Sequence, residues 1–458
     1  MTKLPEGPPG ENRMGSMPEN RLLLKVSAPM AFSMLLQALY NIVDGIFVSQ
    51  ICENAFTAVS LAFPVQFLLI AMGVGTGVGV NAMLSKCLGE KDFDGANRAA
   101  KNAIFLAVCY SVLFLIIGLT LSQIYFDIQT DDQEIRLFGR QYMSIICCFS
   151  FGAYGQIVFE KLLQSTSRTV QSMIIQAIGC ILNLILDPIL IFGWLFFPKM
   201  GVVGAAVATV SGQIIGAVCG YFINRKYNSE LDCSMIGFRP HAPTIKRIYK
   251  VGIPAILQQA VGSFLNFGMN QILLTFTPTA SAVFGAYFKL QSFIFMPVIG
   301  LNNGMVPILA YNYGAGKRKR VMKTMQLAIV YACVIMLIGL SLFHTIPGLL
   351  LGMFDASPTM LRIGCHALRV ISLSFLFAGF CIVCCSVYQA MGYAHYALIQ
   401  SCCRQLVVLL PAAWLLSFKG LDAVWWSFPI AEIASVIMSV LFLMRVYNKV
   451  IKHIPNNP

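Results

Sequence analysis

Residues 170–196 read VQSMIIQAIGCILNLILDPILIFGWLF, an almost unbroken apolar run that holds a single charged side chain, Asp187. About 20 apolar residues in succession allow a helix to cross the hydrocarbon core of a bilayer. A carboxylate at that depth is costly, so it usually faces a cavity and marks an ion or substrate path. The stretch therefore predicts a membrane-spanning helix with a functional acidic residue. Asp44 stands alone in another apolar stretch in the same way.

The rest of the chain has the same membrane-like composition. Of 458 residues, 57% are hydrophobic and 11% are charged, and the mean hydropathy is +0.74. An ordinary globular domain has about a quarter of its residues charged. Charged segments divide the chain into twelve apolar stretches, which predict an all-α integral membrane protein with twelve transmembrane helices. The expected spans are 22–51, 55–85, 102–125, 138–160, 170–196, 201–224, 250–276, 281–310, 324–350, 364–391, 396–418 and 423–446.

Lys and Arg residues are distributed unevenly between the two sets of loops. With the N-terminus in the cytoplasm, 24 of the 32 fall on that side, Lys161 and Arg168 among them, and 6 fall on the other. Such a bias is typical of cytoplasmic loops, so both termini are expected inside a cell membrane. Topology and anionic lipid then account for the net charge of +13, and no nucleic acid is expected as a partner. The expected parts are a tail (1–21), an N-lobe (22–224), a linker (225–249), a C-lobe (250–446) and a second tail (447–458), with tails and linker cytoplasmic.

Most of the fifteen cysteines lie inside the apolar stretches, where a thiol behaves as a small buried hydrophobic group. Cys381 and Cys384 have the spacing of a metal-binding pair, but no second pair and no nearby histidine supports them. We therefore expect neither a metal site at these cysteines nor a cofactor.

An internal repeat organises the chain. A shift of 225 positions superimposes uncommon residues of the second half on those of the first, together with hydropathy and loop charge. Near the end of each half the register changes by six. The two halves predict two six-helix lobes related by a pseudo-two-fold axis along the membrane normal, with a central cleft suited to alternating access. The coinciding residues are Pro29 with Pro254, Asn41 with Asn266, Gly75 with Gly300, Gly89 with Gly314 and Gly201 with Gly420.

Polar residues share a helical face with each of the two aspartates. Gln37 and Tyr40 precede Asp44 by seven and four positions, and Asn183 precedes Asp187 by four. Residues at these spacings lie on one side of a helix, and such a polar stripe is unlikely to face lipid. Both aspartates are expected at a similar depth, in the outer half of the bilayer.

Two further features place the expected site in the first half. Pro188 has no backbone N–H, so the carbonyl of Leu184 is free to accept from water or to coordinate a cation. Thr209 is expected at a comparable depth. The repeat places Met269 and Ala412 opposite the two aspartates, so the second lobe lacks both carboxylates. Binding and release of a proton or Na⁺ by a pair of carboxyl groups can be coupled to a conformational change. Alternatively, the two aspartates could serve only to hydrogen-bond neighbouring helices.

Several motifs together resemble the multidrug and toxic compound extrusion (MATE) family, and within it the subgroup of the staphylococcal exporter MepA. The motifs are Tyr40-x-x-x-Asp44, the glycines of 73–77, 88–90, Asn183-x-x-x-Asp187-Pro188, 201–209 and 311–316. The resemblance covers nearly the whole chain. It implies an antiporter, expected as a monomer in the lipid bilayer, that expels small cationic amphipathic organic molecules in exchange for H⁺ or Na⁺. The implied cation-coupling site comprises Gln37, Tyr40, Asp44, Asn183, Asp187 and Thr209; Na⁺ would bind Asp44, Asp187, Asn183 and Thr209.

The chain departs from one branch of the family. Members of the NorM type carry acidic residues in the seventh and tenth spans, and this sequence has none there. Glu160 and Glu432 are the other candidate acids within spans, although carboxylates near helix ends usually reach water. Lys289 and Arg404 stand within apolar segments, where they could pair or extend to the interface.

Two other functions share part of this sequence pattern. A flippase or exporter of a lipid-linked or endogenous metabolite shares the general architecture, but a more basic cavity is expected of it. A membrane enzyme would need a cluster of catalytic groups, and Asp131, Asp132 and Glu134 form the only acidic cluster. We interpret that cluster as a solvated turn, so an enzyme is not expected.

Overall fold

The computed structural model describes residues 13–194, 197–354 and 356–456, and within this part of the chain it contains helices and no β-sheet. The parts of the predicted tails at 1–12 and 457–458, and the end of the fifth span at 195–196, lie outside the described residues. Contacts between Cα atoms divide the chain into two units. We call the unit of Phe32–Leu88 and Asp92–Tyr249 the N-lobe, and the other unit, which includes Lys250 onward, the C-lobe.

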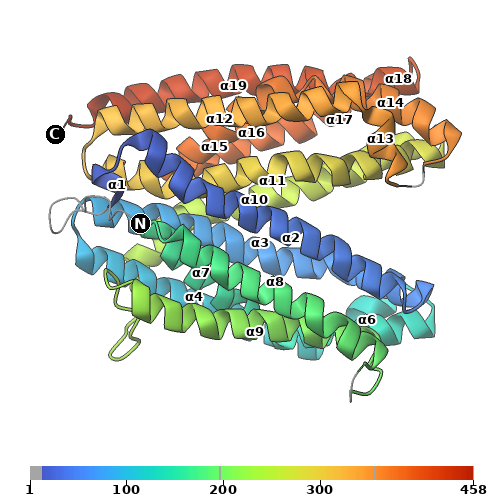
Figure 1. The fold of residues 1–458 in the computed structure, drawn as a ribbon, viewed down its shortest axis with the longest axis horizontal. Helices are drawn as coiled ribbons and strands as arrows, with labels where there is room; N and C mark the ends of the chain where they lie inside the picture. Colours follow the sequence, from blue (N-terminus) through green and yellow to red (C-terminus); the bar gives the residue numbers. More distant parts are fainter. Residues whose placement is uncertain (1–12, 195–196, 355, 457–458) are drawn as a thin grey trace, which may run out of the picture. The chain divides into compact units, whose positions relative to one another are not determined.

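The N-lobe contains the helices drawn from blue to green in Figure 1. Its first helix, α2, is continuous across Pro29 but is divided between the two units. Residues up to Ala31 belong to the C-lobe, and residues from Phe32 belong to the N-lobe. The helices are α2 (Glu19–Ser49), α3 (Glu53–Gly89), α4 (Phe93–Thr120), α5 (Ser122–Gln129), α6 (Gln133–Cys148), α7 (Phe151–Ser165), α8 (Thr169–Phe192) and α9 (Val202–Tyr227).

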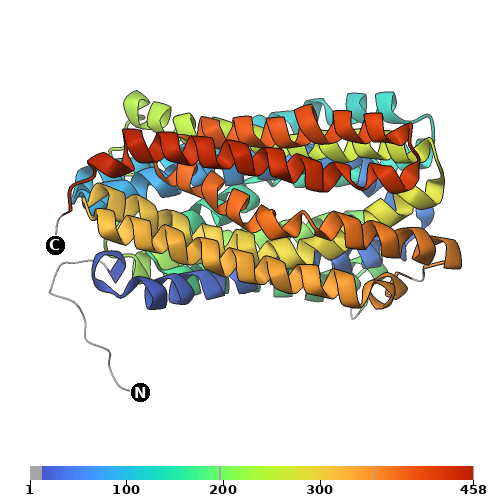
Figure 2. The ribbon, with the colours of Figure 1, turned by 90° about the horizontal axis from the view of Figure 1, so that it is seen from above.

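The C-lobe repeats this order from yellow to red, and its α19 runs almost the full length of the unit in Figure 2. The short α1 (Arg13–Ser16) also belongs to this unit. The helices are α10 (Ala242–Leu274), α11 (Pro278–Gly314), α12 (Arg318–Thr345), α13 (Pro347–Gly352), α14 (Pro358–Ser372), α15 (Phe375–Ala390), α16 (Ala394–Cys402), the π-helix η1 (Cys403–Leu409), α17 (Leu410–Ser417), α18 (Leu421–Val424), α19 (Ser427–Lys449) and the short 3₁₀-helix η2 (Ile451–His453).

The repeat predicted from sequence is confirmed by the helix bounds. Helices α3 and α11 each have 37 residues, α4 and α12 each have 28, and both members of each pair begin and end 225 positions apart. The change of register is confirmed as well. Gly201 directly precedes α9, and Gly420 directly precedes α18, at the start of the last span of each half; both have positive φ, at 55° and 110°. Glycine adopts this backbone region without the steric cost that a Cβ adds.

The helix lengths agree with a multi-pass membrane protein. Nine described helices are long and apolar enough to span a bilayer, and two bent pairs, α6 with α7 and α14 with α15, bring the number to eleven. The bends are 44° and 51°, at equivalent places in the two halves. The remaining predicted span corresponds to α10, whose 33 residues suffice in length although its beginning carries Lys246, Arg247 and Lys250.

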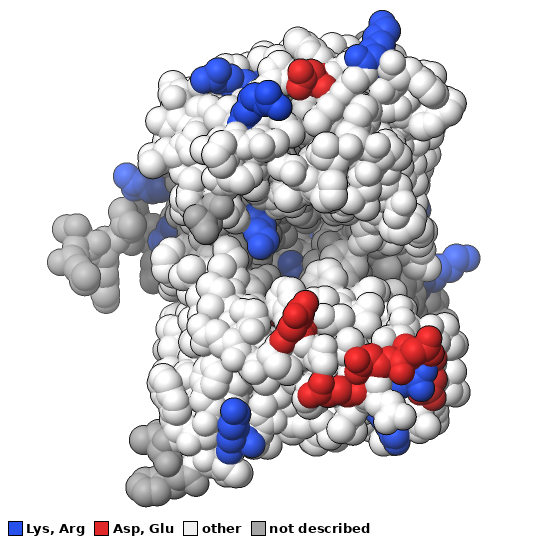
Figure 3. All heavy atoms as spheres, turned by 90° about the vertical axis from the view of Figure 1, so that its right-hand side faces the viewer, with Lys and Arg blue, Asp and Glu red and all other residues white. Residues whose placement is uncertain are grey.

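Capping residues explain the acidic turn noted in the sequence. The carboxylate of Asp132 accepts from the backbone N–H groups of Glu134 and Ile135 at the start of α6, and Asp131 pairs with Arg136 at 3.2 Å. A carboxylate at this position stabilises the beginning of a helix. Figure 3 shows red acidic side chains gathered at this end of the molecule. The cluster is therefore an exposed cap, as the sequence predicted.

Candidate functional site

The site begins with two buried polar residues one turn apart in α8. Asn183 is 2% exposed and Asp187 is fully buried. Helix α9 approaches α8 closely because it carries glycine where the two backbones meet: a Cβ at Gly204 would lie 2.5 Å from the carbonyl oxygen of Leu190, and one at Gly212 would lie 2.7 Å from that of Gly179. This close packing brings Thr209, 3% exposed, against Asn183.

The amide of Asn183 connects these two helices. The amide can form hydrogen bonds on both sides when its nitrogen faces Asp187. Nδ2 then donates to Oδ2 of Asp187 at 2.7 Å. Its oxygen then accepts from the hydroxyl of Thr209 at 3.2 Å. The orientation of the amide fixes one oxygen of Asp187 as an acceptor.

Helix α2 brings Asp44 and Tyr40 to the same place. The carboxyl group of Asp44 lies within hydrogen-bonding distance of that of Asp187, and the hydroxyl of Tyr40 lies near that of Thr209. Oδ1 of Asp44 and Oδ1 of Asp187 are buried, and neither finds a hydrogen-bond donor among the described residues. Two carboxylates in contact repel each other unless a proton or a cation lies between them. The structure thus assembles five of the six predicted residues in the N-lobe.

Gln37 is not part of this assembly. Its amide contacts that of Gln176 in α8. When the amide nitrogen of Gln176 faces α7, it lies 3.1 Å from each carboxylate oxygen of Glu160. The same carboxylate accepts a hydrogen bond from Nε2 of Gln156 at 2.9 Å. Glu160 is 9% exposed, so the expectation that its carboxylate reaches water is wrong. Helix α8 packs against α7 here, and one amide from each helix, Gln176 and Gln156, takes the place of water.

Sequence reasoning missed Tyr142 in α6. Its hydroxyl donates to Gln66 in α3 at 3.5 Å and lies close enough to Asp44 and Asp187 to interact with them electrostatically. A tyrosine in an apolar helix gives no signal of its own, because its ring suits the core equally well. Its place near the two aspartates depends on how helices distant in the sequence pack in the folded N-lobe.

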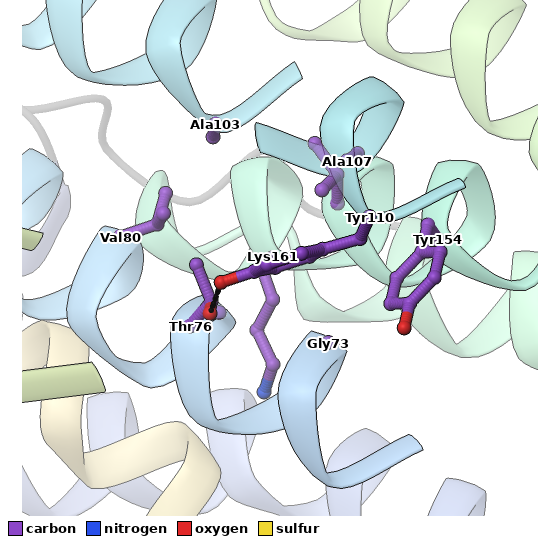
Figure 4. Close-up of a pocket in the computed structure, with 10 residues that line it drawn as sticks. Gly73, Thr76, Val80, Ala103, Ala107, Tyr110, Tyr154 and Lys161 are labelled. Carbon is purple, nitrogen blue, oxygen red and sulfur yellow. Dashed lines mark hydrogen bonds between the residues drawn. The ribbon is translucent and has the colours of Figure 1, made fainter. Parts of the chain in front are cut away.

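The glycine-rich part of α3 forms one wall of a separate pocket, shown in Figure 4. A Cβ at Gly77 would lie 2.8 Å from Cγ of Lys161, so glycine makes room for that side chain. Thr76, Tyr110 and Tyr249 form a chain of hydroxyl contacts at 2.9 and 2.6 Å beside the pocket. Lys161 was counted among the cytoplasmic loop charges, but it is 7% exposed inside α7, where its amine donates to Gln164 at 2.9 Å.

The C-lobe has different polar residues. Met269, opposite Asp44 in the repeat, is fully buried. Arg404 and Glu432 form an ion pair at 2.9 Å, whereas Lys289 is exposed and lies over the ring of Phe354. Within the described residues no group of three or more His, Cys, Asp or Glu side chains could hold a metal ion.

The sequence is similar to known drug exporters. It is 27% identical to the multidrug export protein MepA of Staphylococcus aureus (strain MRSA252) over 438 residues, which cover 93% of this chain and 94% of the relative. It is also 27% identical to MepA of Staphylococcus haemolyticus (strain JCSC1435) over 436 residues, covering 94% of each.

Solved structures share the fold. An outward-facing multidrug resistance MATE family transporter of the MOP superfamily matches with a TM-score of 0.90 at 24% identity, over 98% of this chain and 100% of that one. A MATE protein crystallised in complex with MaL6 matches with a TM-score of 0.90 at 25% identity, over 96% and 98%.

The MatE family profile matches this chain twice, over residues 29–189 and 254–415. The two matches begin 225 positions apart, which is the shift of the internal repeat. Together with the two-lobe helical fold, they show that the chain belongs to the MatE family of multidrug efflux transporters and is not an enzyme.

Proposed function

We propose that this protein is a secondary antiporter that exports small cationic amphipathic organic compounds in exchange for a coupling cation. The observation that carries the proposal is the contact between Asp44 and Asp187, each with a buried Oδ1 that finds no donor among the described residues. A proton or a cation would relieve the repulsion between these groups, and its loss would restore it. Occupancy of the pair is thus coupled to the packing of α2 against α8.

H⁺ is the coupling ion of this proposal, because the two carboxyl groups lie within hydrogen-bonding distance and can share one proton without further ligands. With its nitrogen donating to Asp187 and its oxygen accepting from Thr209, the amide of Asn183 would offer no oxygen to Na⁺. Na⁺ would therefore lose Asn183 and Thr209, two of the four ligands expected from sequence. Its remaining ligands would be the carboxylate oxygens and the carbonyl of Leu184, which has no helical donor because Pro188 lacks an N–H. A shared proton needs no such ligands.

The orientation in the membrane is part of the proposal. Both termini and the segment between α9 and α10 are on the cytoplasmic side, as the distribution of Lys and Arg predicts. The protein acts as a monomer in the lipid bilayer. Its cytoplasmic face would attract anionic lipid, consistent with the net charge of +13.

The test is efflux of ethidium from cells that express the wild type, Asp44→Asn or Asp187→Asn, with the proton and sodium gradients collapsed separately. Asp422→Asn is the matched control, because Asp422 is an exposed carboxylate in the first turn of α18. We expect both site variants to lose efflux at equal protein level, and the control to keep it. Normal efflux by both site variants would refute the coupling site, and no efflux by the wild type would refute the substrate class.

A further inference from the structure

The C-lobe contains a buried ion pair that the N-lobe site does not use. Nη1 of Arg404, in η1, lies 2.9 Å from Oε2 of Glu432, in α19. The side chain of Glu432 is 3% exposed, whereas that of Arg404 is 31% exposed. The carboxylate is therefore enclosed, whereas part of the arginine side chain is exposed.

The position of Arg404 within its span predicts that the ion pair lies deep in the bilayer. Arg404 follows the start of α16 at Ala394 by ten residues, which corresponds to about 15 Å along the helix. The hydrocarbon core is about 30 Å thick, so the guanidinium is near its middle and far from lipid phosphates. Charged groups at this depth face the protein interior or a cavity and mark substrate paths.

Arg404 lies in a π-helix. The widened turns of Cys403–Leu409 interrupt the span between α16 and α17, and the backbone N–H of Leu410 bonds to the carbonyl of Gln405. Such segments are rare and occur mostly at functional sites. Its presence at the only arginine of this span indicates that the position of the guanidinium matters to the protein.

The ion pair leaves groups available. A guanidinium carries five N–H donors, and the contact with Glu432 uses one nitrogen. Oε1 of Glu432 is buried and finds no partner among the described residues. An ion pair that only tied two helices together would favour two parallel hydrogen bonds, which are stronger.

Neutral polar groups are bonded to the same helix three residues before Arg404. Gln389 in α15 donates to Gln258 in α10 at 3.0 Å, and Gln258 donates to Ser401 at 2.9 Å. Ser401 precedes Arg404 by three residues and so lies on the same side of the helix. This chain of hydrogen bonds adds neutral polar groups from α10 and α15 to the helix that carries Arg404.

We propose that Arg404 binds the carboxylate of an amphipathic organic substrate, so that the C-lobe recognises zwitterionic as well as purely cationic compounds. The free N–H groups of Arg404 would donate to the carboxylate, and Glu432 is a positioning residue that neutralises the arginine when the site is empty. A zwitterion brings its own positive charge, which compensates for the second carboxylate beside Arg404. The role in export rests on the proposed function, but the binding does not.

The test compares two dyes that differ in one group. Rhodamine 110 carries a free carboxylate, and rhodamine 123 is its methyl ester and a cation. Binding of each to the purified full-length protein in nanodiscs is measured by fluorescence anisotropy, for the wild type, Arg404→Gln and Glu432→Gln. Lys289→Gln is the matched control, because Lys289 is another cation within an apolar segment and lies over Phe354.

We expect Arg404→Gln to weaken binding of rhodamine 110 by about tenfold or more and that of rhodamine 123 by less than about twofold. Glu432→Gln should strengthen binding of rhodamine 110 relative to rhodamine 123, because it frees the guanidinium of Arg404 from its ion pair. The double variant Arg404→Gln/Glu432→Gln leaves no unpaired charge and should repeat the loss seen in Arg404→Gln, which guards against misfolding of the single variant.

Equal effects of Arg404→Gln on both dyes, or no effect on either, would overturn the proposal. A change of the ratio in Lys289→Gln would also overturn it, since that would indicate a general effect of charge. These outcomes are independent of ethidium efflux, because they are measured at equilibrium without a gradient. Failure of the coupling site and failure of carboxylate recognition are therefore distinguishable.

Discussion

The carboxyl groups of Asp44 in α2 and Asp187 in α8 lie within hydrogen-bonding distance of each other inside the N-lobe. Asn183 holds one oxygen of Asp187 at 2.7 Å, and the buried Oδ1 of each aspartate finds no donor among the described residues. The pair is thus oriented by the protein and incomplete without a proton or a cation.

Replacement of Asn183 by alanine should impair transport without unfolding the protein. The change removes the donor to Asp187 and the acceptor for Thr209, and a hydrogen bond to a charged group contributes about 1.5–3 kcal/mol. We expect ethidium efflux to fall about tenfold or more at equal protein level. Asn41→Ala is the control, because Asn41 is exposed on α2. Wild-type efflux in Asn183→Ala would show that the orientation of Asp187 is unimportant.

Replacement of Gly204 by alanine should destabilise the N-lobe. The new methyl group would lie 2.5 Å from the carbonyl oxygen of Leu190, so α9 must move away from α8. Overpacking of this kind costs about 1–3 kcal/mol. We expect a lower melting temperature in detergent. Gly285→Ala should leave it unchanged or raise it, since nothing lies within 4 Å of that position. Equal melting temperatures for the two variants would contradict the close packing.

The linker should be labelled from the cytoplasmic side. Ser234→Cys places a thiol on an exposed linker residue, and Lys199→Cys places one on the opposite loop. Burial raises the pKa of the neighbouring native Cys233 to about 11, so that thiol should react slowly and add little background. A membrane-impermeant maleimide, followed by peptide mapping, should label residue 199 in intact cells and residue 234 only in inverted vesicles. The reverse pattern would refute the orientation.

An exposed ion pair should stabilise the folded structure of the linker. Lys101 donates to Asp232 at 2.7 Å, and this hydrogen bond, with that from the backbone of Ser234, lowers the pKa of Asp232. A lowered pKa stabilises the fold above the unfolded value of about 4, and the contribution disappears as the pH falls through the folded value.

Asp232→Asn should therefore speed hydrogen exchange of residues 228–241 at pH 7 by about two- to fivefold, because exposed pairs contribute at most about 1 kcal/mol. The difference from the wild type should shrink as the pH falls below about 4. Asp422→Asn, in the C-lobe, should leave exchange in this segment unchanged. A difference that grows at low pH would contradict the sign of the shift.

Much of the fold could be predicted from sequence because its signals are local. Apolar length predicts spans, and coinciding glycines and prolines predict the repeat, whose shift reappears in the bounds of α3 and α11. The carboxylates of the candidate site stand out because burial of charge is rare in such stretches. Their spacing also predicts which of their neighbours share a helical face.

Contacts between distant helices could not be predicted. Gln37 has the correct spacing from Asp44, but its neighbour is Gln176, because the polar face of α2 meets two different parts of α8. Tyr142 carries no sign of its place beside the aspartates. Nor does sequence choose among partners for Arg404, since pairing with Glu432 depends on the packing of η1 against α19.

The most direct test of the account is substrate-driven proton movement in proteoliposomes that contain a luminal pH dye and no sodium. An ethidium gradient is imposed across vesicles with the wild type, Asp44→Asn, Asp187→Asn or Asp422→Asn. We expect the wild type and Asp422→Asn to move protons against ethidium, and the two site variants to move none. Proton movement at the wild-type rate in either site variant, or none in the wild type, would contradict coupling through Asp44 and Asp187.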